Sequence, residues 1–152
     1  HNPERLDIQI MSQVRAMRYT LERCIRGLDT IAVTGNILRG EILRSEGRLD
    51  EAIRAFEQAQ ETHLALRYDE PEPLNFSARH WLGSALLEAG RPADAEAVYR
   101  AALEDHPKNG WCLFGLRDAL EQQGREADAA EVNAQFEEAW GRSDTWIRNS
   151  VF

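Results

Sequence analysis

The chain has 152 residues, and its 43% hydrophobic and 29% charged residues are typical of a single soluble globular domain. The net charge is −8, and the part after Leu49 carries 20 acidic against 10 basic residues. This balance repels a phosphate backbone, so nucleic acid is excluded as the expected partner. No apolar run approaches the roughly 20 residues that span a bilayer, so we expect no membrane insertion.

Residues 1–28 are expected to form a leading helix that covers one end of the domain. Its apolar positions recur at steps of three and four residues, at Ile10, Val14, Met17, Leu21, Cys24 and Leu28. The other face carries Arg15, Arg18, Arg23 and Arg26. This arginine face is either solvated or attracts an anionic partner, and both interpretations stay open.

The two cysteines, Cys24 and Cys112, are far apart in the sequence and lack the spacing of a metal or redox motif. Both lie in helical patterns. We therefore predict that both are buried, small apolar side chains and that they form no disulfide.

Two short amphipathic helices follow each other between Leu82 and Asn109, with Gly90 between them and Pro107 near their end. The same residue types return 34 positions later, and this period with helix–turn–helix content predicts a helical repeat. The matching positions are Leu82, Ala85, Leu86, Gly90, Ala93 and Ala95 in one unit and Leu116, Ala119, Leu120, Gly124, Ala127 and Ala129 in the next. Such units are stable only when stacked, because one hairpin cannot bury its apolar faces alone.

This pattern resembles the tetratricopeptide repeat (TPR), whose consensus has a small residue, an alanine, an aromatic residue, a second alanine and a proline at fixed spacing. The chain fills these positions with Gly83, Ala95, Tyr99, Ala102 and Pro107. An upstream unit carries Gly40, Ala52, Phe56 and Ala59 at the same spacing, and a last, eroded unit keeps Ala129. The resemblance implies an all-α fold of antiparallel helical hairpin repeats, an α-solenoid of about seven helices.

The expected units are a leading helix, three repeats, a loop and a tail. Their bounds are residues 1–28, 31–67, 76–109 and 110–141 for the helices, 68–75 for the loop and 142–152 for the tail. The tail carries Trp146, Ile147, Val151 and Phe152. It is too apolar to be free, so we expect it to pack on the last repeat as a cap, or else to form an exposed patch that dimerises the protein.

The loop between the first two repeats is acidic, and Pro71 and Pro73 exclude a helix there. Loops held by a rigid scaffold often carry function, which makes Tyr68, Asp69 and Glu70 candidate site residues. The alternative is a plain connection between repeats.

The TPR resemblance also implies a concave groove lined by the first helix of each repeat. Its candidate positions are Thr34, Ile37, Glu41, Arg44 and Ser45, then Ser77, His80, Ser84, Leu87 and Glu88, then Trp111, Phe114, Asp118, Glu121 and Gln122. A clamp for a C-terminal carboxylate is not expected, because Ile37 and Glu41 stand where clamp repeats have Lys and Asn.

The third set combines aromatic and acidic side chains. Trp111 and Phe114 would anchor an apolar side chain of a peptide, while neighbouring carboxylates would hold a cation. Alternatively, the tail with Trp146 and Phe152 covers the two aromatic rings. The sequence leaves both interpretations open.

No catalytic motif is found. The histidines His1, His63, His80 and His106 lack metal-ligand spacing, and glycine-rich phosphate loops and nucleophile motifs are absent from the sequence. We therefore expect no metal, no cofactor and no enzyme. The predicted function is a scaffold that binds a protein or peptide segment, with a cationic peptide as the better electrostatic match.

Two alternatives remain. The first is an oligomerisation or docking domain of a larger protein, which includes a homo-oligomer, using the arginine face and the tail. The second, less favoured, is an enzyme or small-molecule site at His80, Glu41 and the acidic loop, which would require a deep polar pocket.

A narrower resemblance bears on localisation. The segments YDEPEP and HPKNGWCLFGL resemble a group of bacterial TPR proteins of unassigned biochemical role, whose full-length members are frequently exported. The chain begins with His1 and shows no signal peptide, so we interpret it as a fragment or a processed chain. Its compartment stays open between the cytoplasm and, for an exported full-length chain, the periplasm or the exterior.

Overall fold

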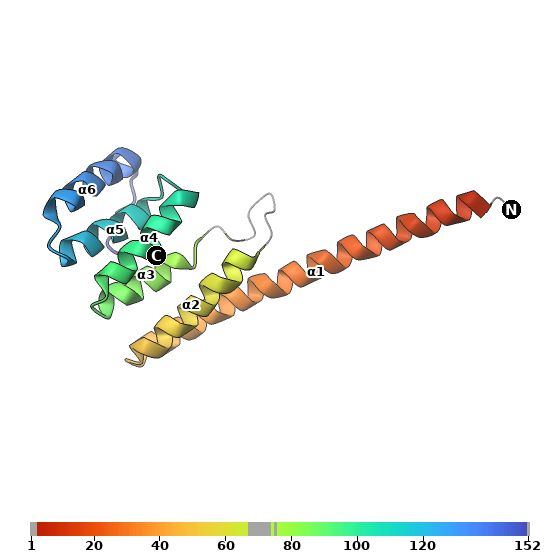
Figure 1. The fold of residues 1–152 in the computed structure, drawn as a ribbon, viewed down its shortest axis with the longest axis horizontal. Helices are drawn as coiled ribbons and strands as arrows, with labels where there is room; N and C mark the ends of the chain where they lie inside the picture. Colours follow the sequence, from red (N-terminus) through yellow and green to blue (C-terminus); the bar gives the residue numbers. More distant parts are fainter. Residues whose placement is uncertain (1–2, 67–73, 75, 152) are drawn as a thin grey trace.

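The computed structural model describes residues 3–66, 74 and 76–151, and this part of the chain folds as six α-helices without a strand. The helices are α1 (Pro3–Ser45), α2 (Leu49–Ala65), α3 (Arg79–Glu88), α4 (Pro92–Asp105), α5 (Gly110–Gln122) and α6 (Glu126–Trp140). Consecutive helices pack as hairpins, and the hairpins stack in chain order (Figure 1). The predicted all-α repeat fold is confirmed.

Helix α1 differs from the expectation of two helices divided near Asp29. It runs without interruption for 43 residues, so one helix stands where two were expected. No proline stands between residues 4 and 70, and the glycines at 27 and 35 lack a following proline or capping partner that would end a helix. The first half of α1 extends away from the other helices (Figure 1). Neither α1 nor any other described helix has a stretch long and apolar enough to cross a membrane.

The turn inside each hairpin is built on a glycine with positive φ. Gly47, Gly90 and Gly124 have φ of 76°, 68° and 71°, a conformation that costs glycine little because it has no Cβ. An arginine follows each glycine and pairs with a carboxylate three residues on, as Arg91 Nε does with Asp94 Oδ2 at 2.7 Å. The predicted hairpin turns are therefore in place.

Aromatic rings pack against glycines where helices approach closely. A Cβ on Gly40 would meet the ring of Phe56, and a Cβ on Gly83 or Gly115 would meet the ring of Tyr99. Phe56 and Tyr99 are completely buried. The small and aromatic residues that carried the repeat pattern are thus the contacts that set the distance between helices.

The two cysteines do not share an environment. Cys112 is buried in α5, as predicted, whereas Cys24 is exposed on α1. The prediction was wrong for Cys24 because the apolar face of α1 to which it belongs lies beyond the stacked hairpins.

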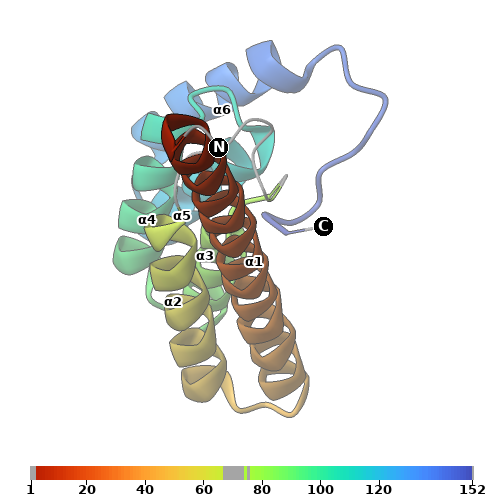
Figure 2. The same cartoon turned by 90° about the vertical axis from the view of Figure 1, so that its right-hand side faces the viewer.

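The tail also differs from the expected cap. Ile147 is buried, but Trp146 is 86% exposed, and Phe152 lies outside the described residues. The segment turns away from α6 and returns towards α3, as Figure 2 shows. It therefore reaches past the last repeat instead of closing its end.

Candidate functional site

The candidate groove residues lie on α1, α3 and α5, the first helices of the three hairpins, except Ser77, which precedes α3. We call the surface that they share the inner surface. Helix α3 packs against α5, and side chains of α1 reach α3. The charged candidates are partly or fully accessible, namely Glu41, Arg44, Glu88, Asp118 and Glu121, whereas Ile37, His80 and Ser84 are buried.

Arg44 links α1 to α3. Its Nε donates to Glu88 Oε2 at 2.6 Å, its Nη2 donates to Ser84 Oγ at 3.4 Å, and its Nη1 lies 3.5 Å from Glu41 Oε1. The guanidinium is thus shared by two carboxylates, which leaves this part of the inner surface negatively charged.

A second guanidinium holds the carboxylates of α5. Arg117 Nη2 donates to Asp118 Oδ1 at 2.7 Å, and its Nε lies 3.6 Å from Glu121 Oε1. Burial raises the pKa of Asp118, Arg117 opposes this shift, and Glu121 adds to it. As on α1 and α3, one cation serves two acids.

The two predicted aromatic anchors pack on α6. Trp111 meets Trp140 edge to face with ring centroids 6.1 Å apart, and Phe114 meets Phe136 in the same way at 5.9 Å. Arg117 covers the Phe114 ring at 4.2 Å from its centroid. The rings are half-buried by their own hairpin, an arrangement that neither of the two earlier interpretations described.

His80 and Ile37 lie in the interior. His80 is 2% exposed and stacks on Trp81, and its burial lowers its pKa to about 4, with His106 and His63 contributing. Ile37 is 7% exposed and belongs to the core. Neither side chain is placed to contact a ligand on the surface. The loop candidates Tyr68, Asp69 and Glu70 lie outside the described residues.

The tail, which was expected either to cap the last repeat or to cover Trp111 and Phe114, instead meets the inner surface at Ser84 and Tyr99. Ser84 Oγ donates to Asn149 Oδ1 at 3.3 Å, and Tyr99 Oη and Ser150 Oγ are hydrogen-bonded at 2.5 Å. Tyr99 belongs to α4, and its ring passes between Gly83 and Gly115 so that its hydroxyl reaches this surface. A buried tyrosine usually has a polar partner for its hydroxyl, and this is the signal from which the contact could have been found.

The charges around the Tyr99 hydroxyl connect these groups. Burial raises the pKa of Tyr99, the hydrogen bond with Ser150 opposes this, and Asp118 and Arg44 act from nearby in opposite directions. The pKa of this one buried hydroxyl therefore depends on residues of α1, α5 and the tail together. We take the hydroxyl as the centre of the inner surface.

Comparison with known families divides the chain into two parts. Residues 37–110 and 86–139 each match a family described as tetratricopeptide repeat. Residues 1–43 match a different family, monomeric isocitrate dehydrogenase. The match to monomeric isocitrate dehydrogenase is confined almost entirely to α1.

Curated relatives match this first part. Isocitrate dehydrogenase [NADP] 2 of Mycobacterium tuberculosis (strain ATCC 25618 / H37Rv) is 80% identical over 39 residues, and that of Psychrobacter sp. (strain 13A) is 74% identical over 39 residues. Each match covers 26% of this chain and 5% of the relative. The chain thus spans a twentieth of the length of these enzymes.

A solved structure matches most of the fold. A point mutant of the protein MamA superposes with a TM-score of 0.56 at 24% identity, over 70% of this chain and 72% of that one. At this identity the likeness concerns the fold and not the partner.

Proposed function

Residues 37–139 belong to the tetratricopeptide repeat family, and on that premise we propose that the chain is a non-catalytic scaffold that holds a cationic protein segment against its inner surface. TPR proteins bind proteins or peptides, and the fold is typically not catalytic. The isocitrate dehydrogenase similarity covers one helix and 5% of the enzyme, so it assigns no reaction to this chain.

The single observation that carries the proposal is the charge of the inner surface. Four carboxylates share two guanidiniums there, in the groups Glu41, Glu88 and Arg44, and Asp118, Glu121 and Arg117. A lysine or arginine from a bound segment would relieve this excess of negative charge. The local charge also agrees with the acidic second part of the sequence.

The double variant Glu88→Gln, Glu121→Gln is expected to weaken the binding of cationic peptides about tenfold at low salt, and less at high salt because screening grows. Both side chains are about half exposed, so the fold should tolerate the change. Fluorescence anisotropy with labelled lysine-containing decapeptides, selected on the wild-type chain from a random library, measures the effect.

A matched control carries the same change of charge elsewhere. Glu104 on α4 and Glu131 on α6 are exposed on the second helices of their hairpins. Glu104→Gln, Glu131→Gln should leave the affinity within about twofold. Equal losses in the two double variants would contradict a site on the inner surface, since only the overall charge would then matter.

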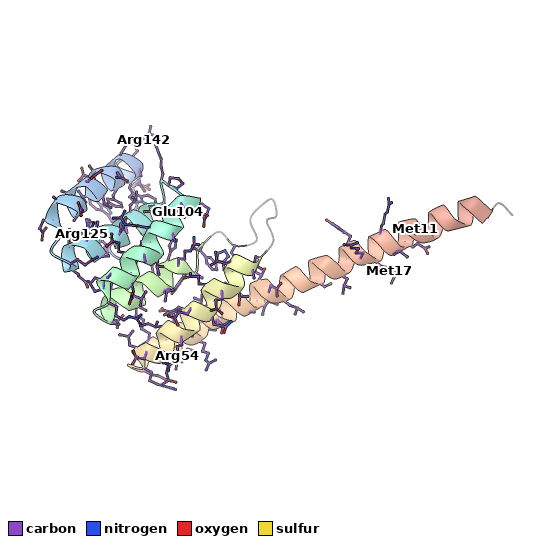
Figure 3. The ribbon with its side chains drawn as sticks, viewed as in Figure 1. Met11, Met17, Arg54, Glu104, Arg125 and Arg142 are labelled. Atoms are coloured by element: carbon purple, nitrogen blue, oxygen red, sulfur yellow. The ribbon has the colours of Figure 1, made fainter. Side chains whose placement is uncertain are left out.

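A second candidate function, self-association, is favoured by a specific feature of α1. Apolar residues recur on α1 at alternating steps of three and four residues, which is the spacing of a heptad repeat. We call these residues the α1 stripe, and they are Val14, Met17, Leu21, Cys24, Leu28, Ile31, Leu38 and Ile42. Cys24 is exposed and each of the other members is exposed by 50% or more, and Met17 stands on the part of α1 that extends from the body (Figure 3). Val33 and Ile37 pack on the opposite side of the helix.

A heptad spacing of 3.5 residues is typical of a helix that pairs with another helix in a left-handed coiled coil. We propose a second copy of this chain in parallel as the occupant of the α1 stripe. Within α1, a parallel pair sets Gln13 beside Arg18 and Thr34 beside Arg39 of the other copy, and neither pair joins like charges. An antiparallel pair would bring Arg18 close to Arg39 of the other copy and be repulsive.

Parallel pairing predicts a cross-link. It brings the two exposed Cys24 thiols face to face, so diamide should convert most of the chain to a covalent dimer, visible on non-reducing gels. Cys112 is buried and should not react. Leu21→Glu, Leu28→Glu should abolish both the cross-link and the dimer in sedimentation equilibrium.

The control Ala16→Glu, Tyr19→Glu places two carboxylates on α1 outside the stripe and should leave the dimer intact. A wild-type chain that sediments as a monomer at about 100 times the protein concentration of the cross-linking experiment would refute the pairing. A dimer without the Cys24 cross-link would refute its parallel orientation.

A further inference from the structure

The segment from Arg142 to Val151 is bound to the inner surface in the manner of a peptide. Trp140 Nε1 donates to the carbonyl oxygen of Thr145 at 2.8 Å, which fixes where the segment leaves α6. The segment then has no regular secondary structure and crosses to the second repeat, where it meets Ser84 and Tyr99. Figure 2 shows it as a wide loop that leaves α6 and ends close to α3.

The contacts of the segment are concentrated in a few residues. Ile147 and Ser150 are 9% and 2% exposed, while Trp146, Arg148 and Asn149 are exposed. The buried positions thus hold one apolar side chain and, three residues later, one hydroxyl. Segments with so few buried contacts open locally more readily than the helices on which they lie.

The Tyr99 hydroxyl at the centre of the inner surface requires a hydrogen-bond partner. The Tyr99 ring is trapped between two glycines, so its hydroxyl cannot withdraw when the segment leaves. A buried hydroxyl without a partner is unfavourable, and Ser150 is the partner that the structure provides. Whatever replaces the segment must therefore bring a hydroxyl or an equivalent group to Tyr99.

We infer that the C-terminal segment is an internal ligand of the inner surface, and that the external ligand is an extended peptide segment with the same chemistry. This chemistry is an apolar residue, a basic residue, an asparagine and a serine, as in Ile147–Ser150. The inference rests on the proposed function, because it identifies the segment that the scaffold would hold. The covalent link gives the internal copy a high effective concentration, so an external ligand binds only when the tail is displaced.

The experiment uses the full chain and a labelled synthetic peptide with the sequence of residues 143–152, followed by fluorescence anisotropy. The variant Ile147→Asp, Ser150→Ala loosens the tail within the intact chain. Trp146→Ala changes the tail at an exposed side chain and is the matched control. The loosened variant is expected to bind the peptide at least tenfold more tightly than the wild type and the control.

Two further measurements locate the contact. A peptide with Asp in place of Ile147 and Ala in place of Ser150 should lose at least tenfold in affinity for the loosened variant. Adding Tyr99→Phe to that variant, which removes the hydroxyl and keeps the ring, should cost a similar factor. Equal peptide binding by all three chains, or binding that is insensitive to these changes, would overturn the inference.

The wild type, the loosened variant and the control are also tested against the selected lysine-containing decapeptides that probe the carboxylates of the inner surface. If these bind the loosened variant and the tail peptide does not, the internal-ligand inference fails while the proposed scaffold function stands. If neither kind of peptide binds while circular dichroism shows unchanged helicity, both fail.

Discussion

Gly115→Ala is expected to lower the free energy of unfolding by about 1–3 kcal/mol, although alanine is the better helix former. A Cβ at Gly115 would lie 2.6 Å from Cε1 and 2.7 Å from Cε2 of Tyr99. The ring cannot move aside, because Gly83 approaches it from the other helix and Ser150 holds its hydroxyl. Urea unfolding followed by circular dichroism measures the loss.

Gly35→Ala is the control for this substitution. Gly35 also lies inside a helix, and nothing stands within 4 Å of the Cβ that alanine would add. This change should therefore leave the stability unchanged or raise it by up to about 1 kcal/mol. A similar loss at both glycines would show that the Tyr99 ring is not the cause.

A double-mutant cycle isolates the contact further. Tyr99→Ala removes a completely buried ring and should itself cost about 3–5 kcal/mol. In that background Gly115→Ala no longer meets an obstacle, so its cost should vanish. Additive losses would contradict a direct contact between the two positions.

Gly83, Gly90, Gly124 and the Tyr99 ring could be identified from the sequence because they carry both local and tertiary information, whereas Gly115 has no place in the repeat pattern and needed the structure. Gly90 and Gly124 mark turns through backbone conformation alone. They are 34 residues apart, so the period gives them equivalent positions in two consecutive repeats. Gly83, Tyr99 and Ala95 fix the distance between helices, and a repeat needs that distance in every unit. The fold of the hairpins could therefore be predicted.

The site could be predicted only in part, because it depends on contacts that no period encodes. The sequence placed Trp111 and Phe114 on the first helix of the last repeat, but their partners Trp140 and Phe136 come from α6. Rotation of α5 by a fraction of a turn would decide whether these rings lie on the surface or pack against α6. The sequence predicts a helix at Glu41 and Arg44, and both lie on α1, yet the ion pair with Glu88 needed the structure.

The length of α1 shows a different limit. Local signals at Asp29 and Thr30 are compatible with a helix start, but nothing in residues 1–28 stops the helix before them. A strong helix-forming run therefore continues through a potential cap. The sequence predicts that its apolar face covers the end of the repeats, whereas the structure leaves that face exposed.

The pH dependence of stability is the second large effect that we expect, and it arises from His80. Its pKa is lowered to about 4, chiefly by burial, while a histidine in the unfolded chain has a pKa near 6.5. Between these two values the unfolded chain binds a proton that the folded chain does not. Stability is therefore complete above pH 6.5 and falls as the pH decreases towards 4.

The expected loss between pH 7 and pH 4.5 is about 2–3 kcal/mol, from about 1.4 kcal/mol per pH unit below 6.5. Urea unfolding at half-unit steps of pH measures it, and His80→Gln should flatten the curve in this window. His106→Gln, at an exposed position, should leave the slope nearly as in the wild type. An unchanged slope in His80→Gln would refute the assignment.

Other titrating groups do not obscure this comparison. The pKa values of Glu51 and Glu96 are lowered from 4.5, so their contributions are lost below that pH and outside the window. Asp118 has a raised pKa and gains stability as the pH falls, in the direction opposite to His80. Because Asp118 is present in both the wild type and His80→Gln, the difference between their curves removes it. What remains is the cost of charging the buried imidazole of His80 on α3, so a single side chain accounts for the expected difference between the two curves.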